Sequence, residues 1–72
     1  MKNRAMLLCI RDNIETVEEY ARKTGVSIAR AAAILKEEVV LTQEEISANC
    51  RLFNCSADYF LALVEENAGI QR

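Results

Sequence analysis

Histidine, proline and tryptophan are absent from this sequence, and glycine occurs only twice in 72 residues. Without histidine there is no Ser-His or Cys-His pair to activate a nucleophile, and there is no imidazole ligand for a metal ion. With glycine only at positions 25 and 69, the chain has no glycine-rich loop to hold phosphates. We therefore expect a protein that is not an enzyme, with no catalytic residue, no metal site and no cofactor.

Cysteine is scarce as well, with three residues at positions 9, 50 and 55. An odd number at this spacing does not form a disulfide framework, and Cys50 with Cys55 supplies too few ligands for a zinc site. We expect three free thiols in a reducing cytosol, with Cys50 and Cys55 largely buried on or beside a helix.

The sequence has no apolar run long enough for a membrane. The run near its start, Ala5–Ile10, ends at Arg11 and Asp12. This run is shorter than the core of a signal peptide and far shorter than a membrane span. The sequence therefore predicts a cytoplasmic protein that does not bind membranes.

What the chain does contain is typical of a small helical domain. Apolar residues make up 51% of the sequence, too many for a disordered segment. A chain rich in Ala, Leu, Ile and Glu and without proline favours an all-α fold. At this length we expect a single domain over 1–72, which buries only about 60% of its unfolded surface.

Charge is distributed unevenly along the chain. Residues 1–36 carry seven basic and four acidic side chains, whereas residues 37–72 carry two basic and seven acidic ones. The net charge of −2 argues against strong non-specific binding of nucleic acid, because neutralised phosphates supply most of that affinity. The basic first half still permits a local contact with nucleic acid.

Four N-cap candidates, Thr16, Ser27, Thr42 and Ser56, mark the starts of helices. Glu19 and Glu45 follow the two threonines at the spacing of a capping box. Together with the apolar periodicity, these signals predict five helices, at about 3–13, 17–24, 28–37, 43–53 and 57–67. The first is apolar all round, so we expect it to pack centrally or to serve a dimer.

The segment of about 16–36 has the spacing of a helix-turn-helix. Ala21 is small where the next helix would cross over it, and Gly25, four residues later, suits a turn with positive φ. Ala31 and Ile34 fall on the side of the second helix that faces the core. A connection this short predicts a steep crossing between the two helices.

Three segments match the pattern of a known family in register. They are Thr16-Val17-Glu18-Glu19-Tyr20-Ala21, Gly25-Val26-Ser27 and Leu52-Phe53-Asn54-Cys55-Ser56-Ala57-Asp58. In these segments the sequence resembles the Cro and phage-repressor (xenobiotic-response-element type) helix-turn-helix family, over about residues 16–61. The resemblance implies a compact five-helix, lambda-repressor-like domain whose usual work is transcriptional control by operator binding.

The resemblance also implies where the chain meets its partner. The candidate contact residues are Val17, Ile28, Ala29, Arg30, Ala32, Ala33, Lys36, Val39 and Val40. Arg30 is the one polar reader among those that would face the bases, whereas direct readout needs bidentate donors and acceptors. Glu37 and Glu38 stand in a loop that in the family often follows the phosphates, and their carboxylates would repel them.

An outward apolar face usually marks a protein interface. We therefore expect a transcription regulator whose recognition helix docks on another regulator, such as a repressor's helix-turn-helix domain, as antirepressors and modulators of repression do. The alternative is direct operator binding as a Cro-like dimer, so a homodimer stays open. A further alternative is that the helix is rotated and its alanines pack inside.

Overall fold

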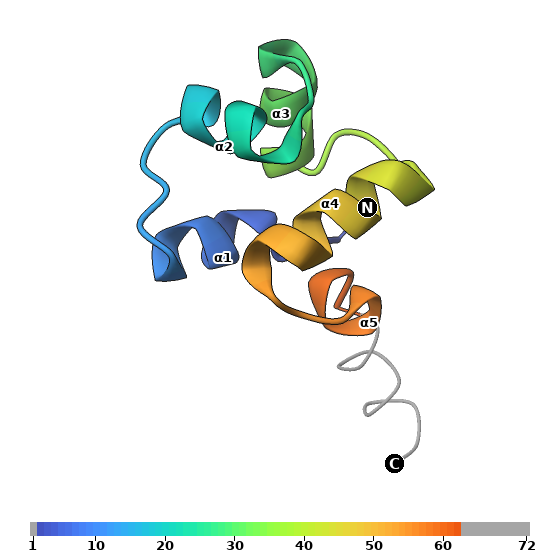
Figure 1. Cartoon of the computed structure of the whole chain (residues 1–72). Helices are drawn as coiled ribbons and strands as arrows, with labels where there is room; N and C mark the ends of the chain where they lie inside the picture. Colours follow the sequence, from blue (N-terminus) through green and yellow to red (C-terminus); the bar gives the residue numbers. More distant parts are fainter. Residues whose placement is uncertain (1, 63–72) are drawn as a thin grey trace.

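The computed structural model describes residues 2–62, and over this range the chain forms helices and no strand (Figure 1). The prediction of an all-α protein is confirmed for these residues. The helices are α1 (Ala5–Arg11), α2 (Val17–Thr24), α3 (Ile28–Leu35), α4 (Gln43–Phe53) and α5 (Ala57–Phe60).

All four predicted N-caps are present. The side-chain oxygens of Thr16, Ser27, Thr42 and Ser56 each accept a hydrogen bond from the backbone N–H three residues later. Only the second predicted capping box is complete, because the carboxylate of Glu19 accepts from the backbone N–H of Glu15 instead of that of Thr16. These caps replace the hydrogen bonds that a helix start lacks, so they fix where α2 to α5 begin.

The turn between α2 and α3 contains only three residues. Gly25 has a φ of 81°, and its N–H donates to the carbonyl of Ala21 at 2.8 Å. Glycine takes this left-handed conformation without the strain that a Cβ brings, as the sequence predicted. Figure 1 shows α2 and α3 side by side on one side of the molecule, with α1, α4 and α5 on the other.

The core lies where these helices meet. Its largest fully buried side chains are those of Tyr20, Phe53, Phe60, Ile34 and Asn49. The rings of Tyr20 and Phe53 are stacked, with their centroids 6.3 Å apart. The same side chains therefore join α2 to α4, and the core supports the position of α3.

The first helix has two faces. Ala5, Leu8 and Cys9 are buried in the core, whereas Met6, Leu7 and Ile10 are exposed. The expectation of central packing is thus correct for one side of α1. Among the described residues, no helix is long and apolar enough to cross a membrane.

The three cysteines are free thiols, as predicted, but their burial differs from the expectation. Cys9 is the buried one, while Cys50 and Cys55 are half-buried. Cys50 lies on α4 and Cys55 in the turn that follows it, and both side chains pack against the core without being enclosed by it.

The last helix is shorter than predicted within the described range. It ends at Phe60, and Ala62 has a φ of 60°. The apolar residues after Phe60 continued the helical periodicity, but periodicity does not show where a helix ends when no glycine marks the end. The remainder of the predicted helix, 63–67, lies outside the described residues.

Candidate functional site

The outward side of α3 carries most of the predicted contact residues. Ala31 and Ile34 are completely buried, so the helix has the orientation that the sequence predicted and is not rotated. We call the opposite side the α3 face, and it consists of Ile28, Ala29, Ala32, Ala33 and Lys36. Ile28 is 55% exposed, Ala29 and Lys36 are exposed, and Ala32 and Ala33 are partly exposed.

The other predicted contact residues are placed differently. Val17 and Val39 are only partly exposed, because both pack against the core. Val40 is 75% exposed and lies on the connection between α3 and α4. Val17 and Val39 therefore contribute more to the core than to the apolar surface. The sequence had placed both among the contact residues.

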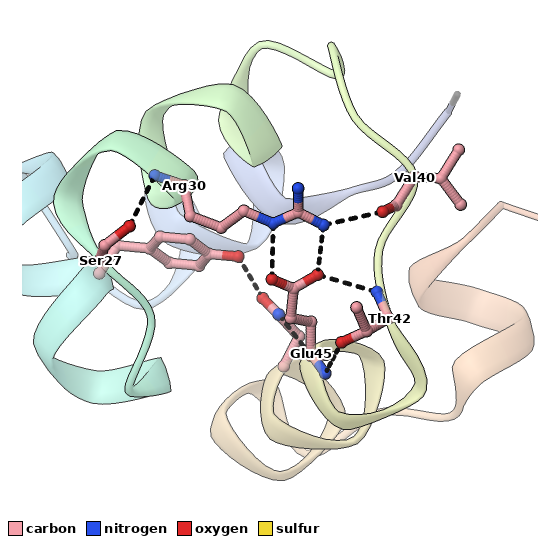
Figure 2. Close-up of polar contacts among 7 residues, drawn as sticks. Ser27, Arg30, Val40, Thr42 and Glu45 are labelled. Carbon is pink, nitrogen blue, oxygen red and sulfur yellow. Dashed lines mark hydrogen bonds and ion pairs between the residues drawn. The ribbon is translucent and has the colours of Figure 1, made fainter.

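Arg30, the one predicted reader of bases, points away from the α3 face toward α4 (Figure 2). Its Nε donates to Glu45 Oε2 at 2.7 Å, and one terminal nitrogen donates both to Glu45 Oε1 at 2.8 Å and to the carbonyl of Val40 at 2.9 Å. This is the bidentate geometry in which a guanidinium binds a carboxylate most strongly. The guanidinium expected on the reading surface thus binds two other residues of the same chain.

Glu45 is itself held in place by the start of α4. Its Oε1 accepts from the backbone N–H of Thr42 at 2.8 Å, and its own N–H donates to the Thr42 hydroxyl at 3.1 Å. Its side chain is only 12% exposed, against 33% for that of Arg30. The hydrogen bonds from Arg30, more than the bond from Thr42, hold the pKa of the Glu45 carboxyl below its ordinary value, and the same contact raises the pKa of Arg30.

A second polar contact lies beneath this pair. The side-chain amide of Asn49 donates to the carbonyl of Glu45 at 2.7 Å, and its oxygen accepts from the hydroxyl of Tyr20 at 2.5 Å. Burial raises the pKa of Tyr20, because the charged phenolate would lose its water. The sequence did not predict this polar role of Tyr20, because the partner Asn49 lies 29 residues away.

The loop after α3 uses one of its two carboxylates structurally. Glu37 Oε1 accepts from the backbone N–H of Asn3 at 2.8 Å, and the side-chain amide of Asn3 donates to the carbonyl of Ile34 at 3.2 Å. Glu38 is exposed. Glu37 therefore ties the end of α3 to the segment before α1, a structural role that the sequence did not predict.

A hollow of about 320 Å³ lies between the α2–α3 turn and the start of α4. Its lining residues are Thr24, Gly25, Val26, Thr42, Glu44 and Glu45. Within residues 2–62, every buried side-chain polar atom has a hydrogen-bond partner, and no group of three acidic or cysteine side chains is arranged to hold a metal ion. No buried polar atom without a partner lies in this hollow, and its lining includes none of the predicted contact residues, so we take the α3 face as the candidate site.

Comparison with known proteins gave no match to a family model, to a curated protein or to a solved structure. The chemistry of the α3 face and of the side chains around it is therefore the basis for a function.

Proposed function

We propose that this protein is a cytoplasmic, non-enzymatic transcription regulator of the Cro and phage-repressor helix-turn-helix type that acts by docking its α3 face on a partner regulator. In this role it is an antirepressor or modulator of repression. The sequence resemblance over residues 16–61 supports the class of protein. The three-residue turn at Gly25 and the packing of α2 against α3 are compatible with that motif.

The position of Arg30 is the observation that carries the choice of partner. Bases are distinguished by side chains that donate and accept hydrogen bonds, and the guanidinium that would do so is bound by Glu45 and Val40. What remains on the α3 face is one isoleucine, three alanines and one lysine. Such a surface suits burial against apolar side chains of another protein, with Lys36 at its edge.

Direct operator binding as a Cro-like homodimer is the second candidate. It is favoured by the basic first half of the chain, with seven basic against four acidic side chains in residues 1–36. The exposed apolar side of α1, with Met6, Leu7 and Ile10, offers a surface for a second copy. The two candidates differ in chemistry, because DNA binding releases counterions and protein binding buries apolar area.

The experiment begins with a transcription regulator that co-purifies with the tagged protein from its native host. In a gel shift, the wild-type protein should release this regulator from its operator. Ile28→Asp should abolish the effect, because it places an unpaired carboxylate in an apolar interface. Leu7→Asp is the matched control, since it adds the same charge at an exposed apolar residue of α1.

A calorimetric titration then separates the two candidates. Binding to the regulator should depend weakly on salt and have a negative heat-capacity change. Glu38→Lys, at the exposed carboxylate of the loop, should leave that binding unchanged or weaken it. If the wild-type protein alone shifts an operator at physiological salt, and Glu38→Lys tightens the shift, direct DNA binding replaces the partner model.

A further inference from the structure

We infer that Glu45 is a specificity-determining residue. It holds the Arg30 guanidinium against the start of α4 and so prevents this group from binding nucleic-acid phosphates. The inference deepens the proposed function. It rests on that function in one respect, because it takes α3 as the helix that would otherwise approach DNA. It assigns the exclusion of DNA to one side chain outside the α3 face.

Arg30 binds a carboxylate with the same group that would bind a phosphate. The planar fork of a guanidinium fits a carboxylate and a phosphate in the same bidentate way, so Glu45 competes inside the molecule for the group that a phosphate would use. Both bonds of the fork are short, at 2.7 and 2.8 Å, and the carbonyl of Val40 accepts a third bond at 2.9 Å. A phosphate would have to replace all three.

The two partners differ in how firmly they are held. Glu45 is anchored through its carboxylate and its N–H by Thr42 and through its carbonyl by Asn49. The Arg30 side chain is 33% exposed, so its guanidinium lies at the surface. Glu45 is thus the fixed member of the pair, and Arg30 is the member that a change at Glu45 would release.

Removing Arg30 from Glu45 would also leave a carboxylate that is only 12% exposed without its charged partner. A largely buried carboxylate without a charged partner is costly, so a phosphate should not displace Glu45 from Arg30. This cost disappears when residue 45 is neutral. Glutamine is the informative replacement, because its side-chain oxygen still accepts from the Thr42 N–H and preserves the cap of α4.

The test measures binding of the full chain to a short fluorescent DNA duplex of mixed sequence, by anisotropy over a series of salt concentrations. Glu45→Gln should bind about tenfold more tightly than the wild type at low salt, the order expected of one charge-assisted contact. The slope of log affinity against log salt should steepen by about 0.9, the value for one added phosphate contact. Adding Arg30→Ala to Glu45→Gln should remove both gains.

Glu44→Gln is the matched control, because it removes the same charge from the first turn of α4 at an exposed residue without touching Arg30. Equal affinities for Glu44→Gln and Glu45→Gln would overturn the inference, since net charge alone would then explain the gain. Wild-type binding to the duplex as tight as that of Glu45→Gln would overturn it too. Failure of the partner model leaves this comparison unaffected, because the duplex carries no operator.

A second measurement serves if Glu45→Gln does not fold. In the wild-type protein, the Nε–H of Arg30 should be protected from hydrogen exchange with water in nitrogen-15 spectra, because it donates to Glu45. Arg30→Lys keeps the net charge but has no fork, so it should bind the duplex more tightly than the wild type. An unprotected Nε–H, or no gain with Arg30→Lys, would overturn the inference.

Discussion

The hydroxyl of Tyr20 and the side chain of Asn49 form a hydrogen bond in the core, and both side chains are fully buried. Asn49 is the one buried polar side chain among residues 2–62. Its amide binds the carbonyl of Glu45, so the contact links α2 to the residue that holds Arg30. A buried polar contact thus adjoins the residue that binds Arg30.

Tyr20→Phe should lower the free energy of unfolding by about 1–3 kcal/mol, because it leaves the buried oxygen of Asn49 without a donor. Urea denaturation measures this loss. The double variant Tyr20→Phe with Asn49→Leu removes both polar partners and should recover part of it. A single variant as stable as the wild type would contradict a buried hydrogen bond at this position.

Ala21→Leu should lower the free energy of unfolding by roughly 1–3 kcal/mol through overpacking. Ala21 is only 4% exposed and lies on α2 one turn before Gly25, which opens the turn to α3. Ala29→Leu, at an exposed residue of α3, is the control and should change stability by less than about 0.5 kcal/mol. Similar effects of the two substitutions would show that Ala21 is not at the crossing.

Gly25→Ala should lower the free energy of unfolding by about 1–2 kcal/mol, because a residue with a Cβ is strained in the left-handed conformation. The φ of Gly25 is 81°, and an added Cβ would meet no atom within 4 Å. The cost therefore comes from the backbone and not from a clash. Gly25→Asn should cost less, since asparagine tolerates this conformation better, and thermal unfolding can rank the three proteins.

Acid should destabilise the protein partly through Glu45. Its folded-state pKa is lowered, chiefly by Arg30, so its contribution to stability is fully present above its ordinary value of 4.5. The contribution is lost as the pH falls through the folded pKa, because the unfolded chain then binds the proton more readily. Below about pH 4.5, the melting temperature should therefore fall less steeply with decreasing pH in Glu45→Gln than in the wild type. An equal fall of the melting temperature in the two proteins would contradict the pairing of Glu45 with Arg30.

Cys9 should react much more slowly with iodoacetamide than Cys50 and Cys55 in the folded protein. Burial, aided by the nearby carboxylate of Asp12, raises the pKa of the Cys9 thiol to about 11, and the side chain is only 4% exposed. The thiolate is the reactive form, so both effects slow alkylation. Mass spectrometry of peptides after timed alkylation would measure this, and equal rates for the three thiols would contradict the burial of Cys9.

The starts of the helices were predictable because their signals are local. A cap such as that of Ser27 on Arg30 N–H joins residues three positions apart, so the sequence shows both partners at once. The orientation of α3 was predictable for a similar reason, since Ala31 and Ile34 recur at helical spacing and are both buried.

The partners of the charged residues were not predictable from the sequence. Arg30 reaches Glu45 only because the connection after α3 returns the chain past it, and Glu37 meets Asn3 from 34 positions away. The sequence contains both residues of such a pair, but it does not show how the helices pack to bring them into contact. The sequence therefore did not show that Arg30 binds Glu45, whereas the exposure of Ile28 and Ala29 on the outward side of α3 followed from helical spacing.

The chain of contacts from Tyr20 through Asn49 and Glu45 to Arg30 has a consequence for how the molecule opens. Tyr20 joins α2 to α4 through Asn49, and Arg30 joins α3 to α4 through Glu45, while the contact between Asn49 and Glu45 lies within α4. Detaching α4 therefore breaks hydrogen bonds to both of the other helices. Local opening of any of these helices has to break at least one of these contacts in addition to its apolar packing. We therefore expect the backbone amides of α4 to be protected from exchange with solvent at least as strongly as those of α2 and α3.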